Sequence, residues 1–560
     1  MESKSTTDEQ ILKVWKDLYP SEAYSQGFND CAGRLFVPSN TNVNEGIRTI
    51  TELKNSCDEL QIKILESIEV SLELLSREPQ IAFRQITQAI SDHLLKETTN
   101  EQHLISLLEQ SECAIRATSE RFVRRSIPSG LRIYTLLSVN ALSGMLEGLR
   151  SGKASSKLMD HCTLLIQLLQ EVKVQFHIEG FVNGKFEEIE QITQNYGFDL
   201  DRADFYPSVL KKAFDYFETP DELEQKALSW LSEEIQKFGY VVSEIASIYG
   251  CDANAEVVEK KVIENPSLKA SGIVSTIKSV RNIVEALVKE RVVGINKNYD
   301  TRVEPTPAYF TRFWPGGIVN GFDIFTRQFN IWYMTTDDSD GRFVAATSVS
   351  ELLDMILHEM YGHCLHFSNS AFHFAENPRL IELISTPHQG PISEGISLNR
   401  EREFIEVTKS LERRGQLTRA ESGYVDLMES YGGLHLMNLQ FEFAVRQWRL
   451  LRFLRVIGSV RVNMKKQSLL EFLSWASDYT KISRRKLWFE IFPTHEAQFP
   501  GYATTYAVVE EEIRSIEDNL EEESKKVSFS TYICSLGFPP RSIFRKRMEE
   551  FAKNLDYKKT

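Results

Sequence analysis

Residues 357–366 of this 560-residue chain read Leu-His-Glu-Met-Tyr-Gly-His-Cys-Leu-His. The stretch joins a histidine to a glutamate and adds further histidines within an apolar segment that favours a helix. A zinc hydrolase needs such a set, because two imidazoles hold the metal and the adjacent carboxylate activates a water molecule. The common helical form is His-Glu-x-x-His, whereas here one extra residue separates His358 from His363.

The extra residue poses a geometric problem. On an α-helix, residues four apart are about 40° apart around the axis, and residues five apart are about 140° apart. A one-residue π-bulge at 360–362 would bring His358 and His363 onto one face, and Gly362 would tolerate that distortion. Alternatively His366, three residues after His363, is a ligand. We favour His358 and His363 as metal ligands, with His366 as a supporting residue beside them.

A catalytic zinc takes three protein ligands and leaves one position for water. Glu394 is our choice for the third ligand, because it opens a predicted helix 31 residues after His363. Glu401 follows seven residues later on the same helical face, where it is placed to hydrogen-bond a ligand histidine. Alternatively, Glu394 has only a structural role, in which its negative charge interacts favourably with the dipole at the helix N-terminus. Other candidates for the third ligand are Glu376, Glu382 and His388.

Glu359 directly follows the first predicted ligand. At this position its carboxylate would act as general base, taking a proton from the activated water and passing it to the leaving amine. The alternative is a glutamate that only faces solvent. The sequence thus predicts one Zn²⁺ per chain, with Glu359 as the catalytic base.

The composition restricts the class of protein. The net charge is -14, whereas nucleic-acid binders usually carry a basic excess, so we expect no nucleic-acid partner. The seven cysteines are scattered and form no Cys-x-x-Cys pair, which argues against a disulfide framework. The first eight residues lack the apolar core of a signal peptide, and no run of about 18 apolar residues is present. We therefore expect a cytoplasmic protein without a membrane partner.

Apolar periodicity divides the chain into three predicted parts. Residues 1–300 read as a helical half that forms a cleft wall or lid. Residues 301–525 would form the zinc-binding catalytic region, with a small sheet between about 308 and 337 that precedes the histidine helix. Residues 526–560 read as a charged C-terminal segment.

Three separated motifs give the chain a resemblance to the gluzincin metallopeptidases. The stretch 358–366 looks like the oligopeptidase pattern His-Glu-Phe-Gly-His-Ala-Leu-His with one residue inserted. The stretch 394–401 looks like Glu-Gly-Trp-Ala-Leu-Tyr-Ala-Glu, and 500–506 looks like Pro-Gly-Gln-Ala-x-x-Tyr, both from uncharacterised bacterial predicted zinc peptidases. The chain thus resembles thimet-oligopeptidase and oligoendopeptidase-type enzymes, Taq-type carboxypeptidases and that bacterial group. His-Glu-x-x-Gly-His is also the dipeptidyl-peptidase III pattern.

The resemblance implies a mostly α fold, with a deep cleft and a small β-sheet beside the zinc helix. It also implies that a tyrosine or histidine of the third motif stabilises the oxyanion. Tyr506 and Tyr502 are the candidates, followed by His495. The further tyrosine of oligopeptidases, three positions beyond Tyr506, is Val509 here, which is a departure from the pattern.

Together these features predict a zinc metallopeptidase of oligopeptidase or carboxypeptidase type that hydrolyses oligopeptides. Its partner would be a peptide substrate. A catalytically inactive protein of the same fold that binds peptides or scaffolds partners is one alternative. A zinc amidohydrolase that acts on a non-peptide amide is another, because the metal chemistry is the same.

Overall fold

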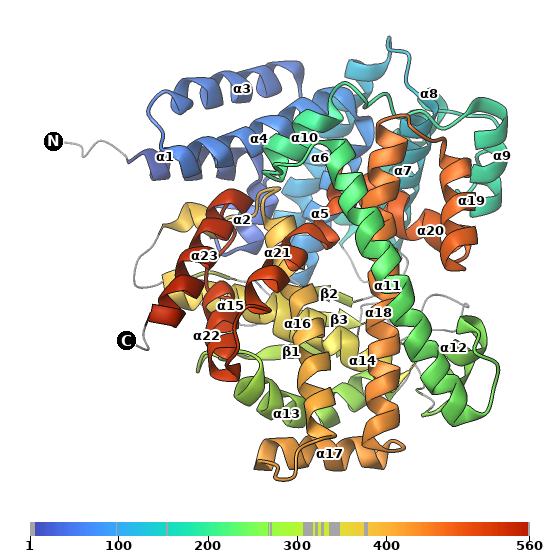
Figure 1. Cartoon of the computed structure of the whole chain (residues 1–560). Helices are drawn as coiled ribbons and strands as arrows, with labels where there is room; N and C mark the ends of the chain where they lie inside the picture. Colours follow the sequence, from blue (N-terminus) through green and yellow to red (C-terminus); the bar gives the residue numbers. More distant parts are fainter. Residues whose placement is uncertain are drawn as a thin grey trace.

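The computed structural model describes residues 6–96, 98–152, 155–266, 268, 272–305, 317–319, 323–325, 330–334, 346, 348–374 and 379–557. Helices dominate these residues, so the predicted mostly α fold is confirmed (Figure 1). Several helices begin as local sequence signals dictate. Thr6, Asp58 and Thr418, for example, each accept from the third backbone N–H of the helix they precede, and the glutamate or glutamine there bonds back.

The N-terminal half is a stack of helices. Those before residue 215 are α1 (Thr7–Leu18), α2 (Pro20–Ser25), η1 (Asn29–Cys31), α3 (Asn40–Lys54), α4 (Glu59–Arg77), α5 (Pro79–Leu95), α6 (Glu101–Phe122), α7 (Ser129–Arg150), α8 (Ser156–Gln175), α9 (Phe186–Tyr196) and α10 (Tyr206–Ala213). The helices α11 (Pro220–Tyr249), α12 (Ala255–Glu264) and α13 (Ile273–Arg291) follow. The long helix α11 leads from this stack towards the lower half of the molecule in Figure 1.

The C-terminal half begins with a sheet and returns to helices. Its strands are β1 (Thr301–Pro305), β2 (Gly317–Val319) and β3 (Asn330–Met334). Its helices are α14 (Val349–Met355), η3 (Ile356–Cys364), α15 (Leu365–Phe374), η4 (Leu380–Glu382), α16 (Gln389–Leu411), α17 (Arg419–Ser430), α18 (Leu434–Asn463), α19 (Leu469–Thr480), α20 (Arg484–Ile491), η5 (Phe492–Glu496), η6 (Tyr502–Tyr506), α21 (Val508–Glu517), α22 (Glu523–Ile533) and α23 (Arg541–Tyr557).

The small sheet lies beside the histidine helix, as expected. Its strand order is β1-β3-β2, with β1 parallel and β2 antiparallel to β3. Both β2 and β3 contact η3. The sheet includes β1, which begins at residue 301 and so before the predicted start near 308. The rest of the predicted sheet region lies outside the described residues, and the expected deep cleft stays a prediction.

Three hydrophobic clusters form the core. The largest joins apolar side chains of residues 70–262 to those of 439–508, and α11 packs along α18 within it. A second surrounds the histidine helix and extends from residue 273 to residue 548. The third holds the first helices and receives Ile381 of η4 and Ile384, which follows it. The division into three parts at 300 and 525 stays a prediction.

Two further observations concern expectations from composition. All seven cysteines lie among the described residues, and none of them forms a disulfide. Within the described part of the chain, every helix is either too short or too polar to cross a bilayer.

Candidate metal centre

The histidine motif adopts a π-helix. The segment η3 (Ile356–Cys364) continues α14 and leads into α15, so the three form one long helix whose middle part has π-helical turns. The expected π distortion is thus confirmed, but it extends over nine residues rather than a single bulge at 360–362. It brings the rings of His358 and His363 to a centroid distance of 4.8 Å at an interplanar angle of 85°. The five-residue spacing therefore places both imidazoles on one face.

Gly362 is required by close packing more than by backbone freedom. A Cβ atom at this position would lie 2.6 Å from the Cβ and 2.7 Å from the Cα of Ser397, closer than carbon atoms approach in proteins. Ser397 belongs to α16, which packs directly on η3. The absence of a side chain at Gly362 lets α16 approach the histidines, and α16 carries the predicted third ligand.

Three donor atoms converge between η3 and α16. The Oε2 atom of Glu394 lies 3.5 Å from Nε2 of His358 and 3.6 Å from Nε2 of His363. The ligand atoms of the three residues all lie within 4.8 Å of one another. Glu394 Oε2 is buried and accepts no hydrogen bond from the described residues. The structure therefore brings together the three residues predicted as ligands.

The donor set fits a zinc ion. Bonds of about 2.0–2.1 Å at tetrahedral angles place ligand atoms about 3.4 Å apart, which is close to the two distances measured here. A buried carboxylate oxygen without a hydrogen bond is costly unless a cation satisfies it. The combination of two imidazoles and one carboxylate is also a set that catalytic zinc accepts.

The outer nitrogens of the two imidazoles are held by α16. Nδ1 of His358 donates to Oε1 of Glu401 at 2.7 Å, and Nδ1 of His363 lies 2.6 Å from Oγ of Ser393. These contacts fix each ring and direct its Nε2 atom inwards. Glu401 therefore occupies the position expected for it. Ser393 was not predicted, although it immediately precedes Glu394 in the motif.

The charged groups of the site shift one another's pKa values. Burial alone would lower the pKa of His358, but its contacts with Glu394 and Glu401 outweigh burial and raise the pKa to about 10. Burial would raise the pKa of Glu394, yet His363 and His358 bring it down to about 2. Glu394 is therefore a carboxylate at neutral pH. A metal ion would compete with the proton of His358 for the same nitrogen.

Glu359 lies at the edge of the site. Its side chain is half-buried and makes no hydrogen bond within the described part of the chain. Burial lowers the pKa of His363, and the charges of Glu394 and Glu359 oppose that effect. The charge of Glu359 thus acts on His363, and the role of Glu359 as a base stays a prediction.

The aromatic residues of the third motif gather on the other side of Glu394. Tyr502 and Tyr506 lie on η6, which packs against α16, and the ring of His495 stacks on Tyr502 with centroids 5.8 Å apart. His495 Nδ1 donates to the carbonyl of Glu490, so its Nε2 accepts from the Tyr506 hydroxyl at 3.1 Å. Burial, followed by the charge of Glu394, raises the pKa of both tyrosines. Both phenols therefore keep their protons and can donate.

The remaining candidates lie elsewhere. His366 is fully buried, and its Nε2 donates to the carbonyl of Gly537 at 3.0 Å, so it holds the C-terminal segment and does not support the ligands. Glu382 pairs with Arg547, and His388 contacts the carbonyl of Lys63. Glu376 lies outside the described residues.

Comparisons with known proteins identify the fold without an activity. No family model and no curated protein match the chain. A solved structure described as a "putative lipoprotein" from Colwellia psychrerythraea is similar, with a TM-score of 0.67, 14% identity, and coverage of 98% of this chain and 99% of that chain. A second, a "putative lipoprotein of unknown function" from Shewanella oneidensis, has a TM-score of 0.64, 12% identity, and coverage of 98% and 100%.

These comparisons correct several predictions. The proposed membership of the gluzincin metallopeptidases is wrong, because the structures that share the fold over their whole length are not described as metallopeptidases. Hydrolysis of oligopeptides is contradicted by the same finding and is not kept. The predicted cytoplasmic location is also contradicted, because both similar structures are described as lipoproteins. At such low identity the comparison establishes a shared fold over almost the full length of the chain.

Proposed function

We propose that this chain is a zinc-binding protein with one site, formed by His358, His363 and Glu394. The observation that carries the proposal is the buried Glu394 Oε2 atom, which lacks a hydrogen bond and faces two imidazole Nε2 atoms at 3.5 and 3.6 Å. Nitrogen and carboxylate donors at this separation suit zinc. Cobalt and manganese accept the same donors, so they are the metals to compare with zinc.

We further propose that the site is enzymatic and activates water. Bound zinc supplies Lewis acidity, which lowers the pKa of water at an open position. Glu359 would accept a proton from that water, because it directly follows His358 on η3 and its half-buried carboxylate makes no hydrogen bond among the described residues. A purely structural zinc site has no use for such a base.

The two tyrosines supply hydrogen-bond donors for negative charge that develops at the site. Both are partly exposed on η6, next to the α16 segment that carries Glu394. In a site that excludes water, such donors stabilise an oxyanion more strongly than they would in bulk solvent. Because the Tyr506 hydroxyl is engaged by His495, that bond must open before this hydroxyl can donate elsewhere.

The first test measures metal. Purified protein is stripped with a chelator, titrated with zinc against a zinc-sensitive dye, and analysed for bound metal by mass spectrometry. We expect one zinc per chain, and strong binding that requires Glu394. A parent protein that binds no zinc, cobalt or manganese overturns the proposal.

The second test measures activation of water, with a chromogenic ester as a reporter that assumes no natural substrate. Glu359→Gln should retain zinc and lose about 10²–10⁴-fold of the metal-dependent rate, the usual contribution of a general base. The matched control is Glu406→Gln. Glu406 is exposed on α16, so this substitution removes the same charge at a position away from the site. Equal rates for both variants and the parent would remove Glu359 from the chemistry.

A further inference from the structure

A buried arginine lies directly behind the histidine–carboxylate contact. Arg452, on α18, donates from Nη1 to Oε2 of Glu401 at 2.5 Å and from Nη2 to Oε1 at 2.8 Å. The Oε1 atom also accepts from His358 Nδ1 at 2.7 Å. The arginine side chain is 8% exposed and the glutamate 1%. A continuous chain of hydrogen bonds thus joins α18 to a predicted metal ligand.

The geometry of this pair restricts the carboxylate. A guanidinium that binds both carboxylate oxygens fixes the plane of the group and its direction, which a single bond does not do. It also compensates the cost of a buried negative charge. Without Arg452, the carboxylate of Glu401 would be free to turn, and a turned carboxylate would no longer hold the His358 ring in place. The orientation of the His358 ring therefore depends on Arg452, although the two side chains need not touch.

We infer that Arg452 is a positioning residue that sets the metal affinity of the site by aiming Glu401 at His358. The inference rests on the zinc site proposed above, and adds to it a support on α18, 51 residues further along the chain than Glu401. In metalloproteins, loss of such an outer hydrogen-bond partner typically weakens metal binding about 10–100-fold.

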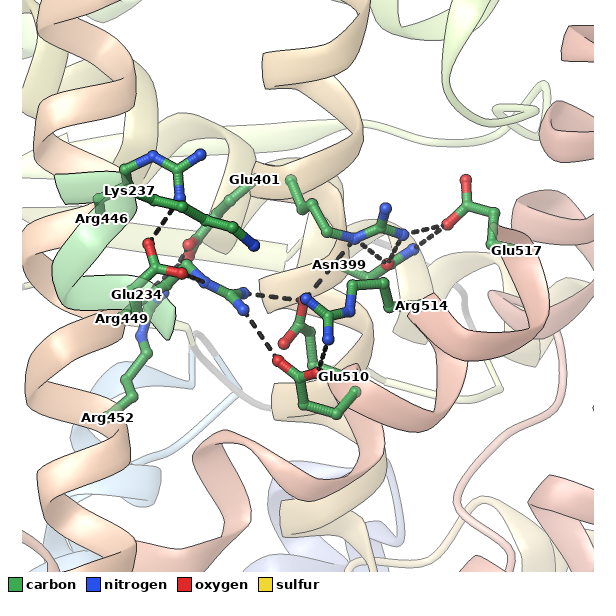
Figure 2. A network of polar contacts seen from close by, with 12 residues as sticks. Glu234, Lys237, Asn399, Glu401, Arg446, Arg449, Arg452, Glu510, Arg514 and Glu517 are labelled. Carbon is green, nitrogen blue, oxygen red and sulfur yellow. Dashed lines mark hydrogen bonds and ion pairs between the residues drawn. The ribbon is translucent and has the colours of Figure 1, made fainter. Parts of the chain in front are cut away.

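The same helix offers a matched control. Arg449 lies one turn before Arg452 on α18 and has an exposed fraction of 9%. It binds Glu234, Glu510 and Glu511 at 3.3, 2.8 and 2.9 Å. Figure 2 shows Arg449 between Glu234 and Glu510, within the network that joins α11, α18, α16 and α21. Both arginines are buried and ion-paired, but among the described residues only Arg452 binds Glu401.

The experiment compares Arg452→Met with Arg449→Met in the full chain. Both substitutions remove an arginine that neutralises buried carboxylates, so both should lower thermal stability. Zinc affinity, measured by dye competition, should fall about 10–100-fold in Arg452→Met and stay at the parent value in Arg449→Met. Cobalt-loaded protein supplies a spectroscopic reading, because a displaced His358 alters the visible absorption of Arg452→Met alone. Equal zinc affinity in the two variants overturns the inference.

Lysine variants cover the case in which a methionine variant does not fold. Arg452→Lys keeps the charge but loses the fork, so its zinc affinity should lie between those of the parent and Arg452→Met. Arg449→Lys should match the parent. If the parent itself binds no metal, the zinc proposal and the effect of Arg452 on affinity both fail, and crystal structures of the metal-free variants still decide whether Arg452 orients His358. A His358 ring that turns away in the Arg452 variants and stays in place in the Arg449 variants supports it, whereas an unmoved ring in both contradicts it.

Discussion

The buried carboxylates in the two halves of α16 differ in their partners. Near its start, Glu394 faces two imidazoles and keeps one buried oxygen without a hydrogen bond. Two turns later, Glu401 is enclosed by a histidine and an arginine, which use both of its oxygens. The arginines on either side of it are also ion-paired, Arg400 with Glu403 and Arg402 with Glu517.

This contrast separates binding from support within one helix. A buried carboxylate whose partners are all present stabilises the arrangement around it and has no capacity to bind a cation. A buried carboxylate with a free oxygen beside two imidazoles is incomplete without one. The carboxylate that faces two imidazoles therefore marks the site, and the carboxylates that pair with arginines mark the structure that holds it.

The largest effect is expected where the contrast is sharpest. Glu394→Ala removes one of three ligands, so zinc affinity should fall by more than about 100-fold, beyond the usual effect of an outer partner. Dye competition measures the change. Glu406→Ala, an exposed α16 substitution, serves as control and should leave affinity unchanged. Full zinc occupancy in Glu394→Ala would erase the distinction between the two halves of the helix.

A second change moves the two helices apart without touching a ligand. Gly362→Ala places a Cβ atom 2.6 Å from that of Ser397, so the free energy of unfolding should drop by about 1–3 kcal/mol, and zinc should bind more weakly as α16 is displaced. Urea titration and dye competition measure the two effects. The control is Gly239→Ala, at an exposed position of α11. A Cβ atom there would have no neighbour within 4 Å, and the free energy of unfolding should rise by about 0.5–1 kcal/mol. A stable Gly362→Ala variant with parent zinc affinity would contradict the role given to close packing.

His366 extends the contrast to the histidines. Burial lowers the pKa of His366. The hydrogen bond to Gly537 raises it only in part, so the pKa is about 3. Between pH 3 and 6.5 the unfolded chain therefore binds a proton at this residue and the folded chain does not. The free energy of unfolding should fall as the pH drops through this range, by up to about 1.4 kcal/mol per pH unit.

Urea titrations at pH 7.5, 6 and 5 measure this slope. In His366→Gln the slope should be shallower by up to the same amount, although the variant is less stable at every pH. Substitution of the exposed His435 by glutamine should leave the slope unchanged. A parent slope that survives in His366→Gln would show that the acid sensitivity arises elsewhere.

The smallest effect concerns the weaker of the two outer contacts. Ser393→Ala removes a neutral acceptor from His363 Nδ1, and such a hydrogen bond contributes about 0.5–1.5 kcal/mol, which corresponds to at most about tenfold in zinc affinity. Glu401→Ala should cost more, because it leaves Arg452 buried without its partner. Affinities for the two variants, measured side by side, rank the supports. A larger loss from the serine would reverse the ranking.

Local sequence patterns were sufficient to predict much of the fold and of the candidate site. Apolar periodicity predicts the helices, and the five-residue spacing of His358 and His363 requires a non-α turn if both are to face one metal. Glu394 could be proposed because it opens a predicted helix 31 residues after His363, with Glu401 seven residues later on the same helical face. These inferences depend on residues that are close together in sequence, where helix geometry restricts the answer.

Long-range contacts were beyond such reasoning. Nothing in the sequence around Arg452 distinguishes it from Arg449 or Arg455 on the same helix, and only the packing of α18 on α16 selects it. His366 shares the motif with the ligands, yet its ring turns to Gly537, 171 residues later. The motifs also suggested a peptidase family, and the composition suggested a cytoplasmic location, and the similar solved structures contradict both. Short motifs describe a local site, and they carry little information about the protein that contains it.

The largest hydrophobic cluster joins residues 70–262 to residues 439–508, with the histidine segment between them. A ribosome that adds about 5–20 residues per second needs about 10–40 s to make the roughly 180 residues that separate the two parts. During that interval α11 exposes the apolar side that α18 later covers, so the nascent N-terminal half is a natural client for a chaperone. The ligands lie between the two parts, and they acquire their final surroundings only after α18, with Arg452, has been made.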